Sequence, residues 1–181
     1  HAESPITGRR WTIEHGFIPT EDQFPRMRAL GLTVTAQNHL YVAAPSLVSY
    51  WGPDRAVLTT PVGWYVSEEI PVSLGTDSPV IPHNPFWVLY HFATRGTISA
   101  GVMGPEHAVG RMGALDLMTR GYAFQVFEEA ERGTLRPGMQ ADLTVLTGDY
   151  LTVSDASLQD LQSVLTVVGG RIVHQSIEEE L

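Results

Sequence analysis

The chain has 181 residues, 43% of them hydrophobic, which is enough for one domain with a core or for one domain and a smaller one. Its 20 acidic residues outnumber 11 basic ones, and the net charge of −9 argues against a general binder of nucleic-acid phosphates. There is no cysteine, which excludes disulfides and a thiol nucleophile, and no apolar run approaches the ~20 residues that span a membrane. We therefore expect no nucleic-acid or membrane partner. A cysteine-free chain fits a cytosolic or an exported protein, and a cytoplasmic location is the working expectation.

The first half of the chain has the pattern of alternating strands and helices. Trp11, Ile13 and His15 recur at every second position, which places them on one face of a strand. Thr20 followed by Gln23 resembles a helix N-cap with its capping-box partner. The expected elements are a strand at 10–15, a helix at 20–30, a strand at 32–37, a long aromatic loop at 40–60, a short helix at 62–69 and a strand at 70–74. This order gives two strand–helix–strand units, which are typical of parallel sheets.

The second half begins with helices and ends with strands. Asn84 and Pro85 are typical of the first positions of a helix, and Gly121 is expected to break the helical pattern that follows. The expected elements are a helix from 85 to about 95, a loop at 96–105, helices at 106–119 and 122–132, a strand at 143–146, and a hairpin of strands 165–168 and 171–173. We therefore predict an α/β domain over residues 1–132 and a mostly β domain over residues 133–181.

Polar side chains follow three of the predicted parallel strands. His15 ends the first strand, Asn38 and His39 follow the second, and Asp77 follows the third. The carboxyl ends of parallel strands meet at one edge of a sheet, so these groups could share a cleft. Imidazole and carboxylate are normal zinc ligands, and a carboxylate beside the metal can serve as a general base. A catalytic zinc usually has three protein ligands, so a packed histidine and an ordinary Asx turn remain the alternative.

Four segments, taken together and in this order, resemble the C-terminal part of a metal-dependent amidohydrolase of the amidohydrolase 3 branch. They are residues 10–15 (RWTIEH), 74–80 (LGTDSPV), 133–146 (GTLRPGMQADLTVL) and 166–173 (TVVGGRIV). The resemblance implies a (β/α)8 TIM-like barrel, of which this chain carries about strands six to eight, followed by strands of a small β-sandwich.

The resemblance also implies roles for single residues. His15 would be a metal ligand, and Asp77 would bind the metal and take the proton from the attacking water. The divalent metal expected from the resemblance is zinc. By their position just past the second strand, Asn38 and His39 are candidates for substrate contact, with residues of a solvated loop as the alternative. His83 is a candidate for the rim of the cleft, with an ordinary surface histidine as the more common case. The implied reaction is hydrolysis of a non-peptide C–N bond of a small amide-type substrate through a metal-activated water.

The chain departs from the family pattern at several ligand positions. It contains no His-x-His pair, no lysine and no histidine that matches the fifth strand. The remaining barrel strands are expected from upstream sequence or from another chain, in a possible homo-oligomer, and we predict that the isolated 181 residues are inactive. The alternative is a non-catalytic or vestigial barrel fragment that acts as a binding or assembly module.

Overall fold

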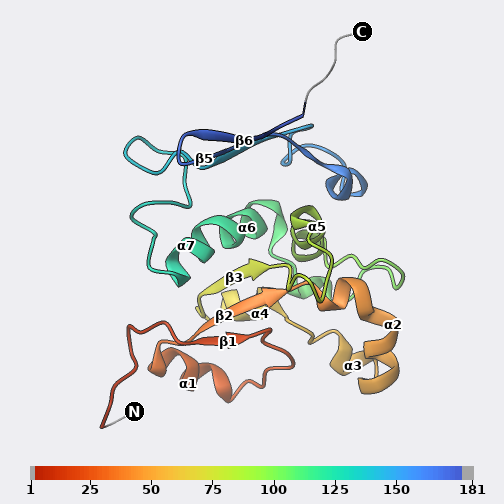
Figure 1. The fold of residues 1–181 in the computed structure, drawn as a ribbon. Helices are drawn as coiled ribbons and strands as arrows, with labels where there is room; N and C mark the ends of the chain where they lie inside the picture. The colour runs from red at the N-terminus through yellow and green to blue at the C-terminus, as the bar shows by residue number, and fades with distance from the viewer. Residues whose placement is uncertain (1–2, 177–181) are drawn as a thin grey trace.

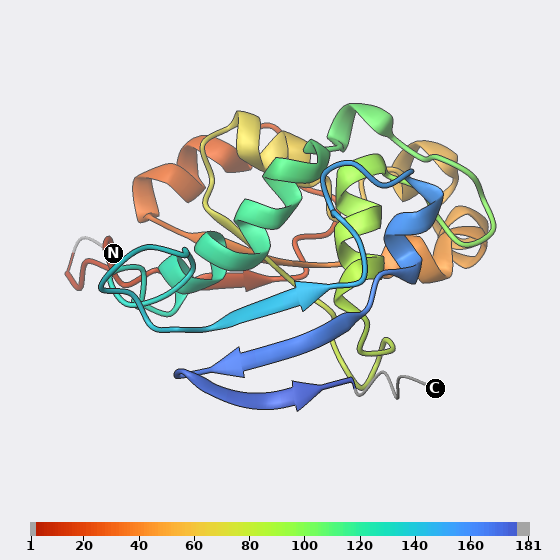
Figure 2. The same cartoon turned by 90° about the horizontal axis from the view of Figure 1, so that it is seen from above.

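The computed structural model describes residues 3–176, and within them lie one parallel and one antiparallel sheet (Figure 1). The parallel sheet has the order β1-β2-β3, and the antiparallel sheet has the order β4-β5-β6. The strands are β1 (Thr12–Glu14), β2 (Thr33–Gln37), β3 (Val72–Gly75), β4 (Leu143–Leu146), β5 (Ser163–Val168) and β6 (Arg171–Gln175). The view from above shows the antiparallel strands as a separate sheet beside the α/β part (Figure 2). The predicted α/β class is confirmed.

Both predicted strand–helix–strand units are present. Helix α1 (Gln23–Leu30) connects β1 to β2, and α4 (Val62–Ser67) precedes β3. Backbone pairing is parallel throughout, with Ile13 opposite Val34 and Val34 opposite Val72. Gly31 ends α1 in the left-handed conformation, where glycine has no steric penalty. The first two strand ends and the turn after β3 therefore lie along one edge of the sheet.

The predicted aromatic loop at 40–60 is wrong, because helices α2 (His39–Trp51) and α3 (Pro53–Ala56) occupy this segment. Leu40, Tyr41 and Ala44 are buried along one side of α2. Tertiary burial of such a face outweighs the penalty of Pro45 in the helix interior. The first residue of α2 follows β2 almost directly, so the helix starts at the edge of the sheet where the strands end.

The predicted break at Gly121 is also wrong. Helix α6 (Gly110–Asp116), a π-helical turn (Leu117–Gly121) and α7 (Tyr122–Gln125) follow one another without a gap. A side chain at Gly121 would collide with the carbonyl oxygen of Val72, so glycine here permits close approach of the helix to β3. The helix ends at Gln125, well before residue 132. A short 3-10 helix (Pro105–His107) precedes α6 where a continuous helix was expected.

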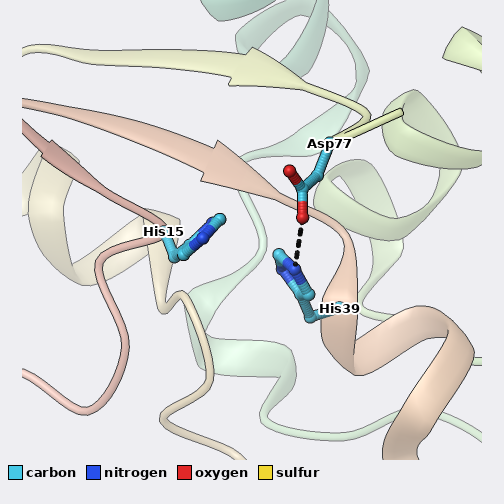
Figure 3. Close-up of side chains that lie close together, drawn as sticks. All are labelled: His15, His39 and Asp77. Carbon is cyan, nitrogen blue, oxygen red and sulfur yellow. Dashed lines mark hydrogen bonds and ion pairs between the residues drawn. The ribbon is translucent and has the colours of Figure 1, made fainter. Parts of the chain in front are cut away.

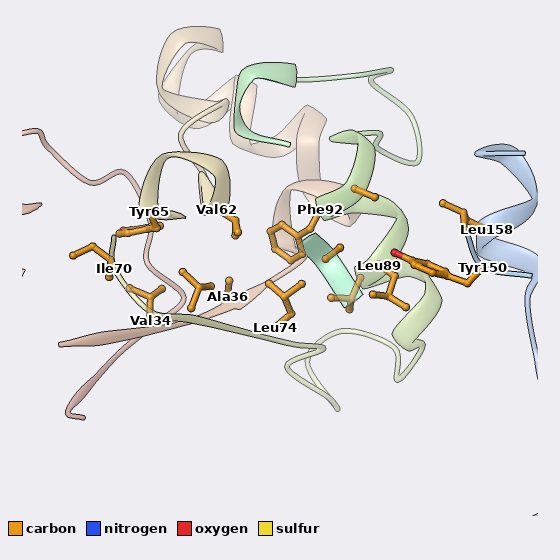
Figure 4. Packing of buried hydrophobic residues seen from close by; sticks show 14 of the residues in the cluster. Val34, Ala36, Val62, Tyr65, Ile70, Leu74, Leu89, Phe92, Tyr150 and Leu158 are labelled. Atoms are coloured by element: carbon orange, nitrogen blue, oxygen red, sulfur yellow. The ribbon is translucent and has the colours of Figure 1, made fainter. Parts of the chain in front are cut away.

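One hydrophobic core connects the two sheets. Helix α5 (Pro85–Thr94) starts as predicted, since the Asn84 side chain accepts a hydrogen bond from the Phe86 N–H. With α6 and α7, α5 lies between the two sheets (Figure 1). Figure 4 shows the packing of core side chains from β2, β3, α4 and α5 with side chains from the segment between β4 and β5. These include Val34, Ala36, Val62, Tyr65, Leu74, Leu89, Phe92, Tyr150 and Leu158. The two predicted domains thus share core contacts, and their boundary at 132/133 stays a prediction.

Strand β1 forms one edge of the parallel sheet. Among residues 3–176, no strand pairs with its outer side, and all three of its residues are exposed. Trp11 and Ile13 are 57% and 39% exposed, which is a large apolar area for an open strand edge. No helix in the part of the chain that the structure describes is long and apolar enough to cross a bilayer.

Candidate metal centre

Three side chains from consecutive strand ends meet at the carboxyl edge of the parallel sheet (Figure 3). His15 follows β1, His39 is the first residue of α2 after β2, and Asp77 lies two residues beyond β3. One potential ligand atom from each lies within 4.8 Å of the others, and all three side chains are half-buried. The structure thus brings His15, His39 and Asp77 together, and it places His39, expected only as a substrate contact, within reach of the same cation. Among the described residues, these three are the histidine and acidic side chains that lie close enough together to hold one cation.

Two of these residues have a left-handed backbone. His15 has φ 66° and Asp77 has φ 58°, a region that His and Asp enter more readily than most residues. Strand β1 ends at Glu14, so the two-residue alternation does not extend to His15. The predicted placement of His15 on the face opposite Glu14 is therefore wrong, and both side chains reach the same partner on β2.

The turn after β1 is held from α4 and from the segment before it. The Thr60 hydroxyl donates to the His15 carbonyl oxygen at 2.8 Å, and the Tyr65 hydroxyl donates to the Gly16 carbonyl oxygen at 3.0 Å. A Cβ atom at Gly16 would lie 2.7 Å from the side chain of Val34, so this close packing requires glycine, as does the positive φ of the residue. The backbone of His15 is thereby fixed independently of its ring.

His39 and Asp77 form a direct polar contact. His39 Nε2 lies 3.1 Å from Asp77 Oδ2, and an ionised carboxylate only accepts, so the ring donates this hydrogen bond. Burial lowers the pKa of His39 below its ordinary value, while the hydrogen bond to Asp77 partly opposes this effect. At neutral pH the ring is therefore neutral, and while Nε2 donates to Asp77 only Nδ1 has a lone pair that could bind a metal.

An aromatic wall, formed by Phe17 and Trp51, stands beside the centre. The Phe17 ring centroid lies 5.4 Å from that of His15 and 4.9 Å from that of His39, and Trp51 packs against Phe17 at 6.1 Å. Phe17 is 36% exposed. One side of the centre is therefore apolar and open to solvent.

Not every predicted site residue lies with the others. Asn38 is almost completely buried at the start of α2, and its Oδ1 has no hydrogen-bond partner in the described residues. His83 is exposed in the segment before α5 and lies outside the group of three. Gln37, which sequence reasoning passed over, contacts His15 directly. Its position at the end of β2, two residues before His39, was the available signal.

The donor set fits a divalent cation of the zinc type. Two imidazoles and one carboxylate are ligands that zinc takes in proteins, and three protein ligands are usual where a position is left open for chemistry. The half-burial of all three residues leaves the group accessible from the edge of the sheet. The residues present thus fit such an ion.

The chain belongs to the amidohydrolase family, whose model matches residues 1–174, and within it to the amidohydrolase 3 branch. The predicted family resemblance is confirmed. An N-substituted formamide deformylase from Arthrobacter pascens is 28% identical over 160 residues, which cover 87% of this chain and 30% of that protein. The chain spans about a third of the length of the curated relatives it matches.

Solved structures share the fold. A metal-dependent hydrolase from Pyrococcus horikoshii OT3 matches with a TM-score of 0.70 and 24% identity, over 80% of this chain and 30% of that chain. The zinc complex of the atrazine chlorohydrolase TrzN from Arthrobacter aurescens TC1 matches with a TM-score of 0.61 and 21% identity, over 91% of this chain and 36% of that chain.

Proposed function

We propose that the protein containing this chain is a metal-dependent hydrolase of amide-type, non-peptide C–N bonds, and that this chain supplies part of its catalytic centre. The observation that carries the proposal is the meeting of His15, His39 and Asp77 at the carboxyl edge of a parallel sheet, in a chain of the amidohydrolase family. His15 and Asp77 are the proposed metal ligands, and zinc is the proposed ion.

We propose that β1, β2 and β3 are strands six to eight of a (β/α)8 barrel, and that β4–β6 are part of a small β-sandwich. The parallel order β1-β2-β3 and the unpaired outer edge of β1, within residues 3–176, support this assignment. Barrel strand five would then pair with β1 and cover Ile13. The remaining strands would come from upstream sequence or from another chain, and the isolated 181 residues would be inactive. Turnover by this chain alone with added zinc would contradict that expectation.

The proposed chemistry divides between the ion and the side chains. When bound, a divalent cation would polarise the substrate carbonyl and acidify water. Asp77 would accept the proton of the attacking water, and its hydrogen bond from His39 Nε2 would hold the carboxylate in position. Because His39 is neutral, this contact orients Asp77 without adding a positive charge that would make the carboxylate a weaker base.

The substrate would lie over the same edge of the sheet. His39 is a proposed substrate contact that also lies within reach of the cation, and Asn38 and His83 are weaker candidates by position. The aromatic wall of Phe17 and Trp51 would pack against an apolar part of the substrate. The named activity of the formamide deformylase relative supports a small amide with a substituent on nitrogen.

The proposal is tested on the full-length protein by metal analysis and by turnover of a panel of small formamides, amides and ureas. We expect His15→Ala and Asp77→Ala to lose bound metal, and Asp77→Asn to lose about 10²-fold or more in kcat. His39→Gln separates two roles, since it lowers metal content only if His39 is a ligand. The matched control is His174→Ala, at an exposed histidine on β6.

Unchanged metal content in both alanine variants would remove the ligand assignment. Stoichiometric metal in the wild type without turnover of any C–N substrate would favour the alternative, a non-catalytic barrel module that works by binding a partner.

A further inference from the structure

The side-chain amide of Gln37 connects Glu14, the last residue of β1, to His15, which follows that strand. It is the last residue of β2 and is only 5% exposed. Its Oε1 lies 2.8 Å from His15 Nδ1, and its Nε2 donates to Glu14 Oε1 at 2.6 Å. A buried amide with a defined partner at each end is held in one orientation.

Glu14 determines which end of the amide faces His15. A carboxylate has no proton to donate, so only the NH2 end of Gln37 can satisfy it. The carbonyl oxygen of the amide is then directed at His15 Nδ1. An acceptor at this position requires a proton on Nδ1 and leaves Nε2 of the neutral ring with its lone pair free.

We propose that Gln37, oriented by Glu14, is a positioning residue that fixes the tautomer and ring direction of His15, so that Nε2 is the metal-binding atom. This inference rests on the proposed function, because it assigns Nε2 of His15 to the same cation. Metal-binding histidines commonly donate their other ring N–H to an oxygen acceptor, which fixes the ring and raises its basicity. Here an amide fills that position, and a carboxylate on the neighbouring strand holds the amide.

The arrangement predicts different effects for three substitutions. Gln37→Leu removes the acceptor, so the ring of His15 can rotate and take either tautomer. Glu14→Leu frees the amide to turn either its oxygen or its NH2 end toward Nδ1, so both tautomers of His15 become accessible. Glu14→Gln can present either an oxygen or an NH2 group to Gln37, so it satisfies both orientations of the amide and no longer fixes one.

The experiment measures zinc affinity of the full-length protein by competition with a chelator, and the His15 ring nitrogens of the metal-free protein by 15N NMR. We expect Gln37→Leu and Glu14→Leu to weaken zinc binding roughly 10–100-fold, the usual effect of losing such a partner. We expect the NMR signals to show a proton on Nδ1 in the wild type, and mixed tautomers in Glu14→Gln and in the two leucine variants.

The matched control is Gln125→Leu. Gln125 also bridges strands of the parallel sheet, since its amide bonds the hydroxyls of Ser73 and Thr12, but it contacts none of the three candidate ligands. If a bridging amide matters only for stability, this control and Gln37→Leu will show similar losses of thermal stability and no change of tautomer. That result would overturn the inference.

The two proposals fail in different ways. If the wild type binds zinc and Gln37→Leu binds it with the same affinity, this inference is overturned and the proposed function stands. Wild-type protein that binds no divalent metal would overturn the proposed function, and the role of Gln37 toward a cation with it. A wild-type ring protonated on Nε2 would overturn the inference whatever the metal affinity.

Discussion

Replacing Arg95 by Met should strongly destabilise the protein. Arg95 follows α5 and its side chain is fully buried. Its guanidinium donates to the carbonyl oxygens of Val57 at 2.8 Å, Thr60 at 3.1 Å and Met103 at 3.1 Å. Burial lowers the pKa of Arg95 to about 10, so the group stays protonated at neutral pH.

The expected loss follows from these three hydrogen bonds. A hydrogen bond to a charged group contributes about 1.5–3 kcal/mol, so three would give an upper bound of roughly 4.5–9 kcal/mol. Removing the desolvation penalty of the buried cation offsets part of this. A net loss of about 3 kcal/mol or more remains, because Met leaves the carbonyl oxygens unsatisfied. For a unit of about 150–250 residues that unfolds as one, the loss corresponds to a fall in Tm of about 6–12 °C.

The loss should also reach the candidate metal centre. The Thr60 carbonyl accepts from Arg95, while the Thr60 hydroxyl holds the His15 carbonyl oxygen. Thermal unfolding and zinc affinity of Arg95→Met are therefore measured side by side. The control is Arg120→Met, which removes an exposed i,i+4 pair with Asp116 and should change stability by about 0.5 kcal/mol or less. A loss in Arg95→Met no larger than in this control would refute the reasoning.

Three further outcomes are expected. Burial lowers the pKa of His91 to about 3, so the native ring stays neutral while the unfolded one is protonated below its ordinary value of 6.5. The free energy of unfolding should therefore fall by about 2 kcal/mol between pH 7.5 and pH 5 through this group, and a urea titration of His91→Asn should lack that share. Gly121→Ala places a methyl group against the Val72 carbonyl oxygen and should lower Tm by several degrees. The control is Gly113→Ala in the preceding helix α6, where the added carbon meets only the Val109 side chain, at 3.1 Å, and Tm should change less. Phe17→Ala should raise KM about tenfold for substrates with an apolar substituent and change kcat less. Equal KM values for apolar and polar substrates, in the wild type and in Phe17→Ala alike, would contradict this prediction.

The parallel sheet was predictable because its signals are local. Short apolar runs ended by Gly or by polar residues gave all three strands to within a few residues, and Asn84 gave the start of α5. Helix α2 was missed because its stability depends on burying Leu40 and Tyr41 against distant parts of the chain. The predicted helix break at Gly121 was wrong for a similar reason, because this glycine permits a long-range contact with β3 and does not end the helix.

The candidate site was predictable in part. The rule that parallel strand ends share one edge brought His15 and Asp77 together, and the structure places them so. The same rule does not give side-chain direction, which depends on the left-handed backbone of His15. The bond from Gln37 to His15 joins residues 22 positions apart, and its direction depends on Glu14. No periodicity in the sequence contains that information.

The left-handed backbone at His15 and Asp77 restricts which amino acids the two positions can accept. Asn and Gly enter this region at little cost, whereas a branched side chain meets a steric penalty of about 1–2 kcal/mol before any chemistry is considered. Asp77→Asn is thus a substitution of charge alone, while Asp77→Val would also redirect the chain after β3. Selection for a different cation should then change neighbours such as positions 37 and 39, whose backbone is unconstrained in this way, before it changes positions 15 and 77.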